Sequence, residues 1–246
     1  MKLTNNPLAL VTGASAGIGA ASARALHAAG AQVLLAARRT ERLQALAEEL
    51  PGSETVQLDV RDASAVQTAL QDRAIDIAVL NAGLARGTGP IQEGDPADWD
   101  EMLDTNVKGV LHCARAVLPG MLQRERGDMV LLGSVAGRQV YPGGNVYNAS
   151  KFAVHALYQA LRLDAGGRGV RFTTLDPGMV ETEFAKVRYR GDEAQANAVY
   201  EGMQPLAPED VADALVYAVT RPAHVNVGEI VLWPTCQSST RDVART

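Results

Sequence analysis

Residues 8–19, LALVTGASAGIG, decide the fold of this chain. The apolar run Leu8–Thr12 has the length of a buried strand, and residues 18–29 follow it with the apolar spacing of a helix. A glycine-rich turn lies directly between the two. A first strand that passes through such a turn into a first helix is typical of α/β proteins that bind a dinucleotide at the turn.

The same alternation of strand and helix continues outward from this stretch to the end of the chain. Further strands are predicted at residues 32–37, 55–58, 75–80, 128–132, 171–175 and 229–233. Helices are predicted at residues 41–50, 63–72, about 97–124, about 146–164 and 208–219. This order predicts an α/β protein, a single doubly wound Rossmann domain over residues 1–246, with a mainly parallel seven-stranded sheet flanked by helices.

Each glycine of the turn has a separate physical task. Gly13 allows the tight turn, Gly17 lets the backbone approach a pyrophosphate, and Gly19 lets the helix pack on the strand. The start of the helix supplies free N–H groups and a partial positive charge. We therefore expect Gly13, Ser15, Gly17, Ile18 and Gly19 to hold phosphates; a purely structural turn is the alternative.

The end of the second strand indicates which dinucleotide is bound. A site for NAD needs an acidic residue about twenty positions beyond the glycine loop. This chain has Ala37 there, followed by Arg38 and Arg39. Two guanidinium groups favour the 2′-phosphate of NADP. The alternative is a pair of solvated arginines at the start of a helix, which leaves the missing acid unexplained.

Composition excludes several other classes of protein. A chain with 47% apolar residues and a net charge of −5 has enough material for a core and no basic footprint for nucleic acid. Cys113 and Cys236 stand far apart, and the four histidines are scattered, so neither a disulfide nor a metal site is expected. No apolar run approaches the roughly 18 residues of a membrane span, and a cytoplasmic location is expected.

Tyr147 and Lys151 are the first candidates for chemistry. Their spacing places them on one helix face about a turn apart. An ammonium group beside a phenol stabilises the phenolate, which would bring the pKa of Tyr147 into the range of general acid–base catalysis. Taken alone, the pair is more often structural than functional.

Two further polar residues give the pair its context. Ser134 follows a buried strand, where its hydroxyl can donate to a substrate oxygen that gains negative charge. Asn106 falls inside the long predicted helix, where an amide is neither a good cap nor a good core residue. It is either surface filler or the holder of a water that relays protons to Lys151.

About thirty residues between Asp176 and Pro208 depart from the regular alternation. They are rich in charge and contain no clear strand. Because they follow the carboxyl end of a parallel strand, where ligands bind in such sheets, we expect a mobile substrate lid at about 179–207. We call these residues the lid segment. A plain surface insertion is the alternative.

Over its whole length the chain resembles the short-chain dehydrogenase/reductase family. The glycine loop, Asp59-Val60, Asn81-Ala82-Gly83 and Pro177-Gly178 with Thr182 are similar to that family's motifs. The resemblance implies that Tyr147 is the acid/base, Lys151 lowers its pKa and binds the nicotinamide ribose, Ser134 polarises the carbonyl and Asn106 supports a water relay. The cofactor residues that it implies beyond the loop and the arginines are Asp59, Val60, Asn81, Ala82, Gly83, Tyr147, Lys151, Pro177, Gly178, Val180 and Thr182.

Two positions depart mildly from the family pattern. Leu80 stands where many members have an asparagine, and Gly133 where many have the first serine of a pair. Neither change removes a catalytic atom, so only local loop geometry is in doubt.

A narrower resemblance, through the lid segment and several loops, is to the NADP-dependent 3-hydroxy acid dehydrogenases. It implies a substrate such as serine or 3-hydroxypropionate, or a semialdehyde in the reverse direction. A carboxylate substrate favours a cation in the lid, and Arg188 or Arg190 can supply one; Ser134, Tyr147 and Arg188 are the predicted substrate residues.

Two other functions stay open at this point. The first is a carbonyl reductase of broad specificity for uncharged ketones or aldehydes. The second is a non-catalytic NADP-binding redox sensor or scaffold. The family resemblance also implies a homotetramer or homodimer, with the long helices pairing across a two-fold axis.

Overall fold

Seven strands form one parallel sheet in the order β3-β2-β1-β4-β5-β6-β7 in the computed structural model, which describes residues 2–246. Every neighbouring pair is parallel. The strands are β1 (Leu8–Thr12), β2 (Gln32–Ala37), β3 (Glu54–Gln57), β4 (Ile77–Leu80), β5 (Gly127–Leu132), β6 (Val170–Pro177) and β7 (Glu229–Leu232). The predicted doubly wound Rossmann fold is therefore confirmed.

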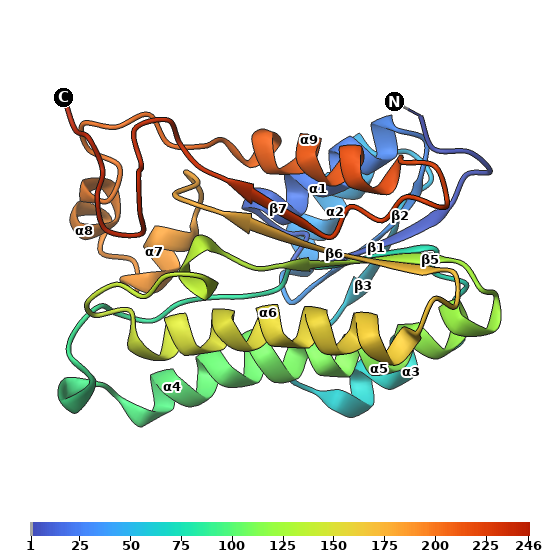
Figure 1. Cartoon of the computed structure of the whole chain (residues 1–246), viewed down its shortest axis with the longest axis horizontal. Helices are drawn as coiled ribbons and strands as arrows, with labels where there is room; N and C mark the ends of the chain where they lie inside the picture. Colours follow the sequence, from blue (N-terminus) through green and yellow to red (C-terminus); the bar gives the residue numbers. More distant parts are fainter. Residues whose placement is uncertain (1) are drawn as a thin grey trace.

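Helices cover both faces of the sheet, as Figure 1 shows. On the upper face of that view lie α1 (Gly17–Ala28), α2 (Thr40–Glu49) and α9 (Pro208–Val219). On the lower face lie α3 (Ala63–Leu70), α4 (Pro96–Leu103), α5 (Gly109–Gln123) and α6 (Asn145–Ala165). None of the helices formed by residues 2–246 is both long enough and apolar enough to cross a membrane.

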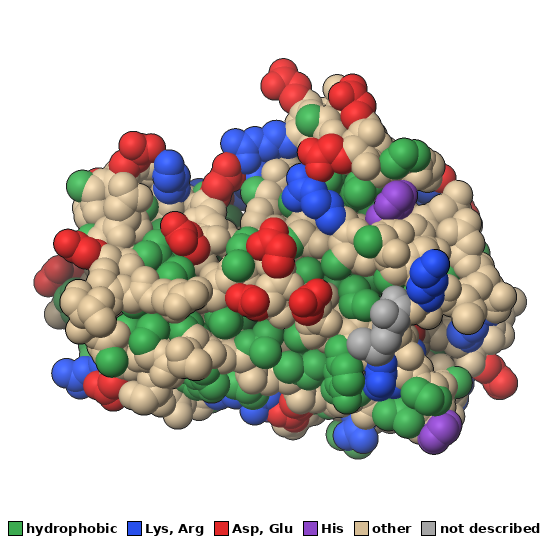
Figure 2. All heavy atoms as spheres, turned by 90° about the horizontal axis from the view of Figure 1, so that it is seen from above, with side chains coloured by type: hydrophobic (Ala, Val, Ile, Leu, Met, Phe, Trp, Pro, Cys, Tyr) green, Lys and Arg blue, Asp and Glu red, His purple; other side chains and the backbone are tan. Residues whose placement is uncertain are grey.

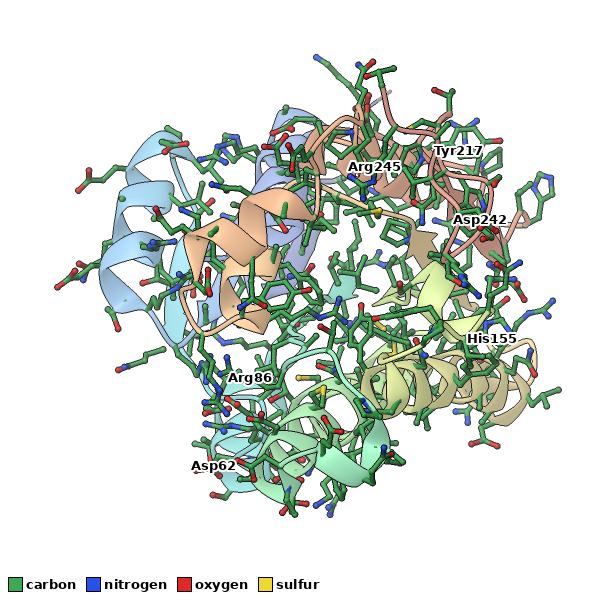
Figure 3. The ribbon with its side chains drawn as sticks, turned by 90° about the vertical axis from the view of Figure 1, so that its left-hand side faces the viewer. Asp62, Arg86, His155, Tyr217, Asp242 and Arg245 are labelled. Atoms are coloured by element: carbon green, nitrogen blue, oxygen red, sulfur yellow. The ribbon has the colours of Figure 1, made fainter. Side chains whose placement is uncertain are left out.

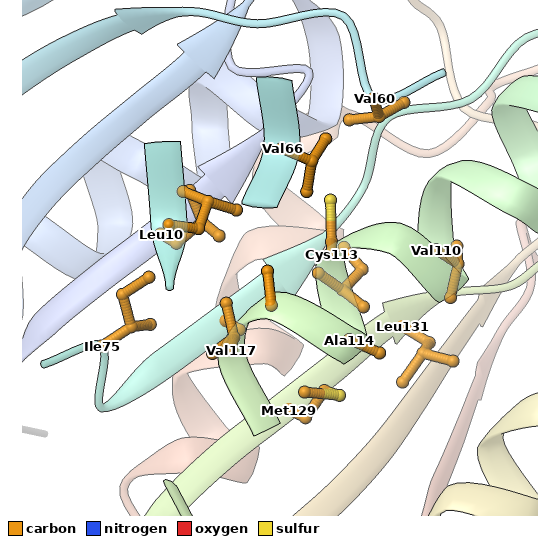
Figure 4. Close-up of a cluster of buried hydrophobic side chains, with 14 of the residues drawn as sticks. Leu10, Val60, Val66, Ile75, Val110, Cys113, Ala114, Val117, Met129 and Leu131 are labelled. Atoms are coloured by element: carbon orange, nitrogen blue, oxygen red, sulfur yellow. The ribbon is translucent and has the colours of Figure 1, made fainter. Parts of the chain in front are cut away.

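The alternation of side chains along each strand divides the core into two layers. In β1, Leu10 points to the lower layer, while Ala9 and Val11 point to the upper one. Figure 4 shows the lower layer, where Leu10 and the buried Cys113 lie among aliphatic side chains from the sheet and α5. Burial on both faces explains why these strands are continuous apolar runs in the sequence.

The predicted long helix over residues 97–124 is the main error in the expected elements. In the structure this region consists of three elements: α4, a π-helical turn over Asp104–Lys108, and α5. The Gly109 N–H donates to the Asp104 carbonyl, one residue farther than in an α-helix. The bounds of the other predicted helices and strands differ from the observed ones by no more than two residues.

The lid segment contains two short helices that sequence periodicity missed, α7 (Phe184–Arg188) and α8 (Glu193–Ala198). Both lie beyond the carboxyl ends of the strands, at the left of Figure 1. The strand order reverses between β1 and β4, which opens a crevice at this same end. The fold therefore places the lid segment over the position where doubly wound proteins bind ligands.

Candidate active site

A cavity of about 630 Å³ opens at the carboxyl end of the sheet. Its wall combines the glycine loop, the ends of β2, β4 and β5, the start of α6, the lid segment and residues after β7. Figure 3 looks at this end, with Arg86 on the side of the lower helices and Arg245 on the opposite side. Most of the predicted site residues line this one cavity.

The glycine loop has the geometry that its residues predict. Gly13 and Gly17 adopt φ values of +68° and +50°, which side chains rarely tolerate. A Cβ on Gly19 would lie 2.3 Å from the Gly13 carbonyl oxygen, so the helix packs on the loop too closely for any side chain. Helix α1 begins at Gly17 without a side-chain cap, which leaves its first N–H groups directed at the cavity for an anion.

Asn81 and Thr12 fasten the glycine loop to β4. Asn81 Nδ2 donates to the Thr12 carbonyl at 2.8 Å, and Thr12 Oγ1 accepts from the N–H groups of Asn81 and Ala82 at 3.0 and 3.1 Å. The side-chain amide of Asn81 therefore contacts the loop. Two residues later, the backbone of Gly83 lies close to the Asn106 side chain: a Cβ on Gly83 would be 3.2 Å from Asn106 Oδ1.

The two arginines after β2 are exposed and reach the edge of the cavity. Arg39 Nε donates to Ser15 Oγ of the glycine loop at 3.1 Å, and its Nη1 pairs with Glu183 of the lid segment at 2.9 Å. Arg42 binds the other oxygen of Glu183 at 2.6 Å. These partners hold the pKa of Glu183 below its usual value, Arg42 having the larger effect. Neither Glu183 nor Arg42 was predicted from the sequence as a site residue.

Asp59 and Val60 lie at the edge of the cavity after β3. Arg61 binds both oxygens of the Asp59 carboxylate, which lowers the pKa of that group. A Cβ on Gly109 would lie 2.6 Å from Val60 Cγ2, so α5 packs closely under this turn. Both predicted adenine-contacting residues are thus held in place by neighbours within the chain.

Ser134 follows the end of β5 and caps a short 3-10 helix over Val135–Gly137. Its Oγ accepts from the Ala136 N–H at 3.1 Å and donates to the Pro177 carbonyl at 3.4 Å. It lies close enough to the Tyr147 hydroxyl to oppose, to a small extent, the rise that burial imposes on the pKa of Tyr147. The predicted serine and tyrosine are therefore adjacent in space. Before Ser134, a Cβ on Gly133 would lie only 1.8 Å from Asp176 Oδ1, so a serine does not fit there.

Tyr147 and Lys151 face each other on α6, with Lys151 Nζ 5.9 Å from the centre of the Tyr147 ring. The expected effect on the tyrosine is not seen in this structure: burial raises the pKa of Tyr147 to about 12. Burial also lowers the pKa of Lys151 to about 8, against the opposing attraction of Asp176. Lys151 Nζ donates to the Leu132 carbonyl at 2.9 Å, which positions it at the base of the cavity.

Asn106 is buried, so its reading as surface filler is wrong. It lies in the π-helical turn, where its Oδ1 accepts from Leu84 N and its Nδ2 donates to Leu84 O, both at 2.8 Å. Nδ2 also donates to Ser150 Oγ at 3.0 Å. Through these bonds the side-chain amide of Asn106 joins the loop after β4 to α6. A relay water would therefore need a different hydrogen-bond partner, such as a backbone carbonyl released by the π-turn.

The residues expected around the nicotinamide follow β6 in an extended path. Gly178 N donates to the Leu232 carbonyl at 2.7 Å, and Val180 forms a bridge with Leu206 at the far end of the lid segment. A Cβ on Gly17 would lie 3.1 Å from Thr182 Cγ2. The start of the lid segment therefore crosses directly over the glycine loop.

The structure separates the two candidate lid cations. Arg188 lines the cavity, with Cζ 5.0 Å from the centre of the Tyr147 ring, and its Nη2 donates to the Tyr141 hydroxyl at 2.6 Å. Its Nε is buried and has no hydrogen-bond partner within the described chain. Arg190 does not line the cavity and instead pairs with Asp98 of α4 on the surface.

The lid segment is attached to the body of the protein on two sides of the cavity. On one side, Glu183 binds the arginines near β2. On the other side, Arg86 Nη1 donates to the Val187 carbonyl at 2.6 Å, and Gly87 N donates to the Arg188 carbonyl at 3.0 Å. Helix α7 thus spans the opening between the two attachments.

Several cavity residues have no recognisable signal in the sequence. Tyr141 and Phe184 enclose Arg188, while Gln237, Thr240 and Arg245 enter from the segment after β7. Only a three-dimensional arrangement brings them together. Within residues 2–246, no group of three or more His, Cys, Asp or Glu side chains is placed to hold a metal ion.

Comparison with known proteins gives consistent matches. A family model described as short chain dehydrogenase matches residues 7–193. The chain is 44% identical, over 94% of its own length and 96% of the relative's, to the NADP-dependent 3-hydroxy acid dehydrogenase YdfG of Salmonella typhi. It is 46% identical to sulfoacetaldehyde reductase 2 of Chromohalobacter salexigens, over 94% and 95% of the two chains.

A solved structure gives a close match over nearly the whole chain. The closed form of a serine dehydrogenase complexed with NADP⁺ is 42% identical and superposes with a TM-score of 0.92. The match covers 97% of this chain and 100% of that chain.

Proposed function

The chain belongs to the short-chain dehydrogenase/reductase family, and on this basis we propose that it transfers a hydride between NADP(H) and a small 3-hydroxy acid. Serine and 3-hydroxypropionate represent this substrate class. Their oxidation gives a semialdehyde, which is the substrate in the reverse direction. The observation that carries the proposal is Arg188, a cation inside the cavity and directly over Tyr147.

Arg188 fits the recognition of an anionic substrate. Its unpartnered, buried Nε points to a missing acceptor, because buried donors are nearly always paired in folded proteins. A carboxylate beside the reacting alcohol supplies that acceptor in a charge-assisted bond. The names of the two relatives agree with this chemistry, since a 3-hydroxy acid and sulfoacetaldehyde both carry an anionic group near the reacting carbon.

The cavity also fits the cofactor. Left-handed glycines and the start of α1 form a cradle for a pyrophosphate, and the exposed Arg38 and Arg39 stand where a 2′-phosphate would lie. NADP⁺, when bound, accepts the hydride from the alcohol carbon. Asp59 and Val60 would line the adenine end, and Lys151, Val180 and Thr182 the nicotinamide end.

The proton is handled by residues of this chain. The Tyr147 oxygen accepts the alcohol proton during oxidation and returns it during reduction, and the Ser134 hydroxyl donates to the substrate oxygen. Lys151 beneath them stabilises the phenolate when it is charged. Asn106 positions Leu84 and Ser150 at the side of this group.

Steady-state kinetics with matched substrates tests the proposal. NADP⁺ reduction is measured with serine, 3-hydroxypropionate, 3-hydroxyisobutyrate, allo-threonine and uncharged secondary alcohols. We expect Arg188→Gln to lower kcat/KM for hydroxy acids by about 10- to 100-fold, the size of a lost charge-assisted hydrogen bond, with a much smaller loss for the uncharged alcohols. Lys186→Gln, which removes an exposed charge from the same helix, is the matched control.

Five outcomes would contradict the proposal or part of it. Equal losses on charged and uncharged substrates would remove the carboxylate role of Arg188. A loss caused by Arg190→Gln instead would move that role to the second arginine. Retained activity in Tyr147→Phe would remove the acid/base assignment, and a lack of turnover on any carbonyl would favour the sensor or scaffold alternative. A preference for uncharged ketones would favour the broad carbonyl reductase.

We further propose a homotetramer, or a homodimer if only one face is used. Leu111 of α5 and Phe152 of α6 are 42% and 41% exposed on the lower face. On the upper face, seen in Figure 2, apolar side chains form a band near the centre, and Tyr217 of α9 is 46% exposed. Light scattering after gel filtration tests this assembly, and a monomer of the wild-type chain would contradict it.

A further inference from the structure

Tyr147 is surrounded by groups from five parts of the chain. Lys151 faces it from α6, Arg188 and Phe184 from α7, Ser134 from the turn after β5, and the phenols of Tyr141 and Tyr200 from neighbouring loops. Among these groups only Lys151 and Arg188 carry positive charge. Apart from burial, the largest effects on the pKa of the Tyr147 hydroxyl come from Tyr141, Arg188, Ser134 and Tyr200, none of which is a carboxylate.

The nearer and more permanent of the two cations is Arg188. Its Cζ lies 5.0 Å from the centre of the Tyr147 ring, against 5.9 Å for Lys151 Nζ. Burial brings the pKa of Lys151 to about 8, so this amine loses its charge at alkaline pH. An arginine keeps its charge throughout that range. Arg188 also opposes the rise that burial imposes on the pKa of Tyr147.

The protein holds Arg188 in this position by several contacts. The guanidinium lies among three rings, at 5.0 Å from Tyr147, 5.5 Å from Phe184 and 5.8 Å from Tyr141. The Tyr141 hydroxyl accepts a hydrogen bond from Nη2. The Arg188 carbonyl is fixed by Gly87 N, and the Val187 carbonyl before it by Arg86. All of these contacts depend on α7 lying across the cavity.

We propose that Arg188 controls the proton affinity of Tyr147: the closed lid segment brings its charge onto the ring and favours the phenolate, and a substrate carboxylate that pairs with Arg188 reduces this effect. The inference rests on the proposed function, because it assumes that Tyr147 is the acid/base. It adds to that function a link between lid position, substrate charge and the state of the catalytic proton. The phenolate then accepts the alcohol proton while the alcohol carbon passes its hydride to NADP⁺.

The size of the effect follows from Coulomb's law. If the 5.0 Å between Arg188 Cζ and the centre of the Tyr147 ring is taken as the separation of the two charges, an effective dielectric constant between about 20 and 80 gives a change of roughly 0.6 to 2.4 pKa units. We expect about one unit, since the site is partly open to solvent. A shift of this size exceeds the error of a careful pH profile.

The test separates the two roles of Arg188 through the choice of substrate. The pH profile of kcat for alcohol oxidation is measured with an uncharged secondary alcohol, so that no carboxylate interacts with the arginine. In Arg188→Gln we expect the apparent pKa to rise by about one unit, and in Arg188→Lys by less. Lys186→Gln, on the outer side of the same helix, should leave the profile unchanged.

A second comparison uses the wild-type enzyme with two substrates. The apparent pKa with a 3-hydroxy acid should lie above that with the uncharged alcohol, and the difference should disappear in Arg188→Gln. A spectroscopic measurement without turnover supports both: the tyrosinate absorbance near 295 nm, taken as the difference from Tyr147→Phe, should appear at higher pH in Arg188→Gln. Circular dichroism verifies that each variant is folded.

The outcomes distinguish this inference from the proposed function. If Arg188→Gln weakens hydroxy acid turnover but moves neither the uncharged-alcohol profile nor the absorbance, the inference is wrong and the substrate role remains. If Arg188→Gln does not fold, an unshifted profile in Arg188→Lys together with equal wild-type profiles for the two substrates overturns it. Full activity of Tyr147→Phe would remove both.

Discussion

Substitution of Gly133 by alanine tests how tightly the end of β5 is packed against β6. A Cβ at this position would lie 1.8 Å from Asp176 Oδ1 and 2.9 Å from Thr174 Oγ1. The Asp176 carboxylate is almost completely buried and is bound by Arg138 at 2.6 Å and by Thr174 Oγ1 at 2.8 Å. To accept the methyl group, the carboxylate must move by more than about 1 Å, which breaks these bonds.

The cost can be bounded from two known effects. Overpacking of a core costs about 1–3 kcal/mol, and loss of the partner of a buried charge costs about 3–5 kcal/mol. Arg138 keeps Glu229 as a second partner, which limits the loss, so we expect Gly133→Ala to lower the free energy of unfolding by about 3 kcal/mol. For a chain of this length the melting temperature should fall by about 6–12 °C.

Urea and thermal denaturation at a fixed protein concentration measure this effect. The double variant Gly133→Ala with Asp176→Ala supplies the control, because removal of the carboxylate makes room for the methyl group. Its destabilisation should be smaller than the sum of the two single effects. A Gly133→Ala variant within about 0.5 kcal/mol of the wild type would refute the reasoning.

Three further predictions concern other buried groups. Burial lowers the pKa of Lys151 from 10.5 to about 8. Between these two pH values the unfolded chain therefore holds a proton on Lys151 that the folded chain has lost. The wild type should gain up to about 3 kcal/mol of stability from this group as pH rises from 8 to 10.5. Urea denaturation of Lys151→Met across this range should lack that gain, and equal slopes for the two proteins would argue against the shift. Burial raises the pKa of the Cys113 thiol to about 12, so iodoacetamide at pH 8 should label Cys236 well before Cys113 in the native protein, as peptide mass mapping can verify. Asn106→Ala leaves buried groups of Leu84 without partners and should cost about 2–3 kcal/mol by urea denaturation, whereas a neutral effect would show that water replaces the amide.

The fold was predictable because parallel strands that are buried on both faces have continuous apolar sequences. Leu8–Thr12 and Gln32–Ala37 are examples, and both strands have the predicted bounds. The break in the long helix was not predictable in the same way. A π-helical turn needs one extra residue, and the bonds that Asn106 makes from this turn to a distant loop have no signal in the apolar spacing.

The candidate site was predictable where one local motif supplies the geometry, as in the glycine loop. It was not predictable where distant segments meet. Arg39 and Glu183 are separated by 144 positions, and no periodicity connects them. Arg188 and Arg190 are two positions apart, and only the end of α7 and the positive φ of Arg190 direct one into the cavity and the other to Asp98.

The two attachments of the lid segment differ in their sensitivity to ionic strength. The ion pairs of Glu183 with Arg39 and Arg42 are more than 40% exposed, so dissolved salt screens them. The hydrogen bonds that hold the Val187 and Arg188 carbonyls involve uncharged backbone acceptors in a half-buried position, and salt affects them little. Concentrated salt should therefore weaken the attachment beside β2 first. Helix α7 would then move away from β2 while it stays bound to the loop after β4.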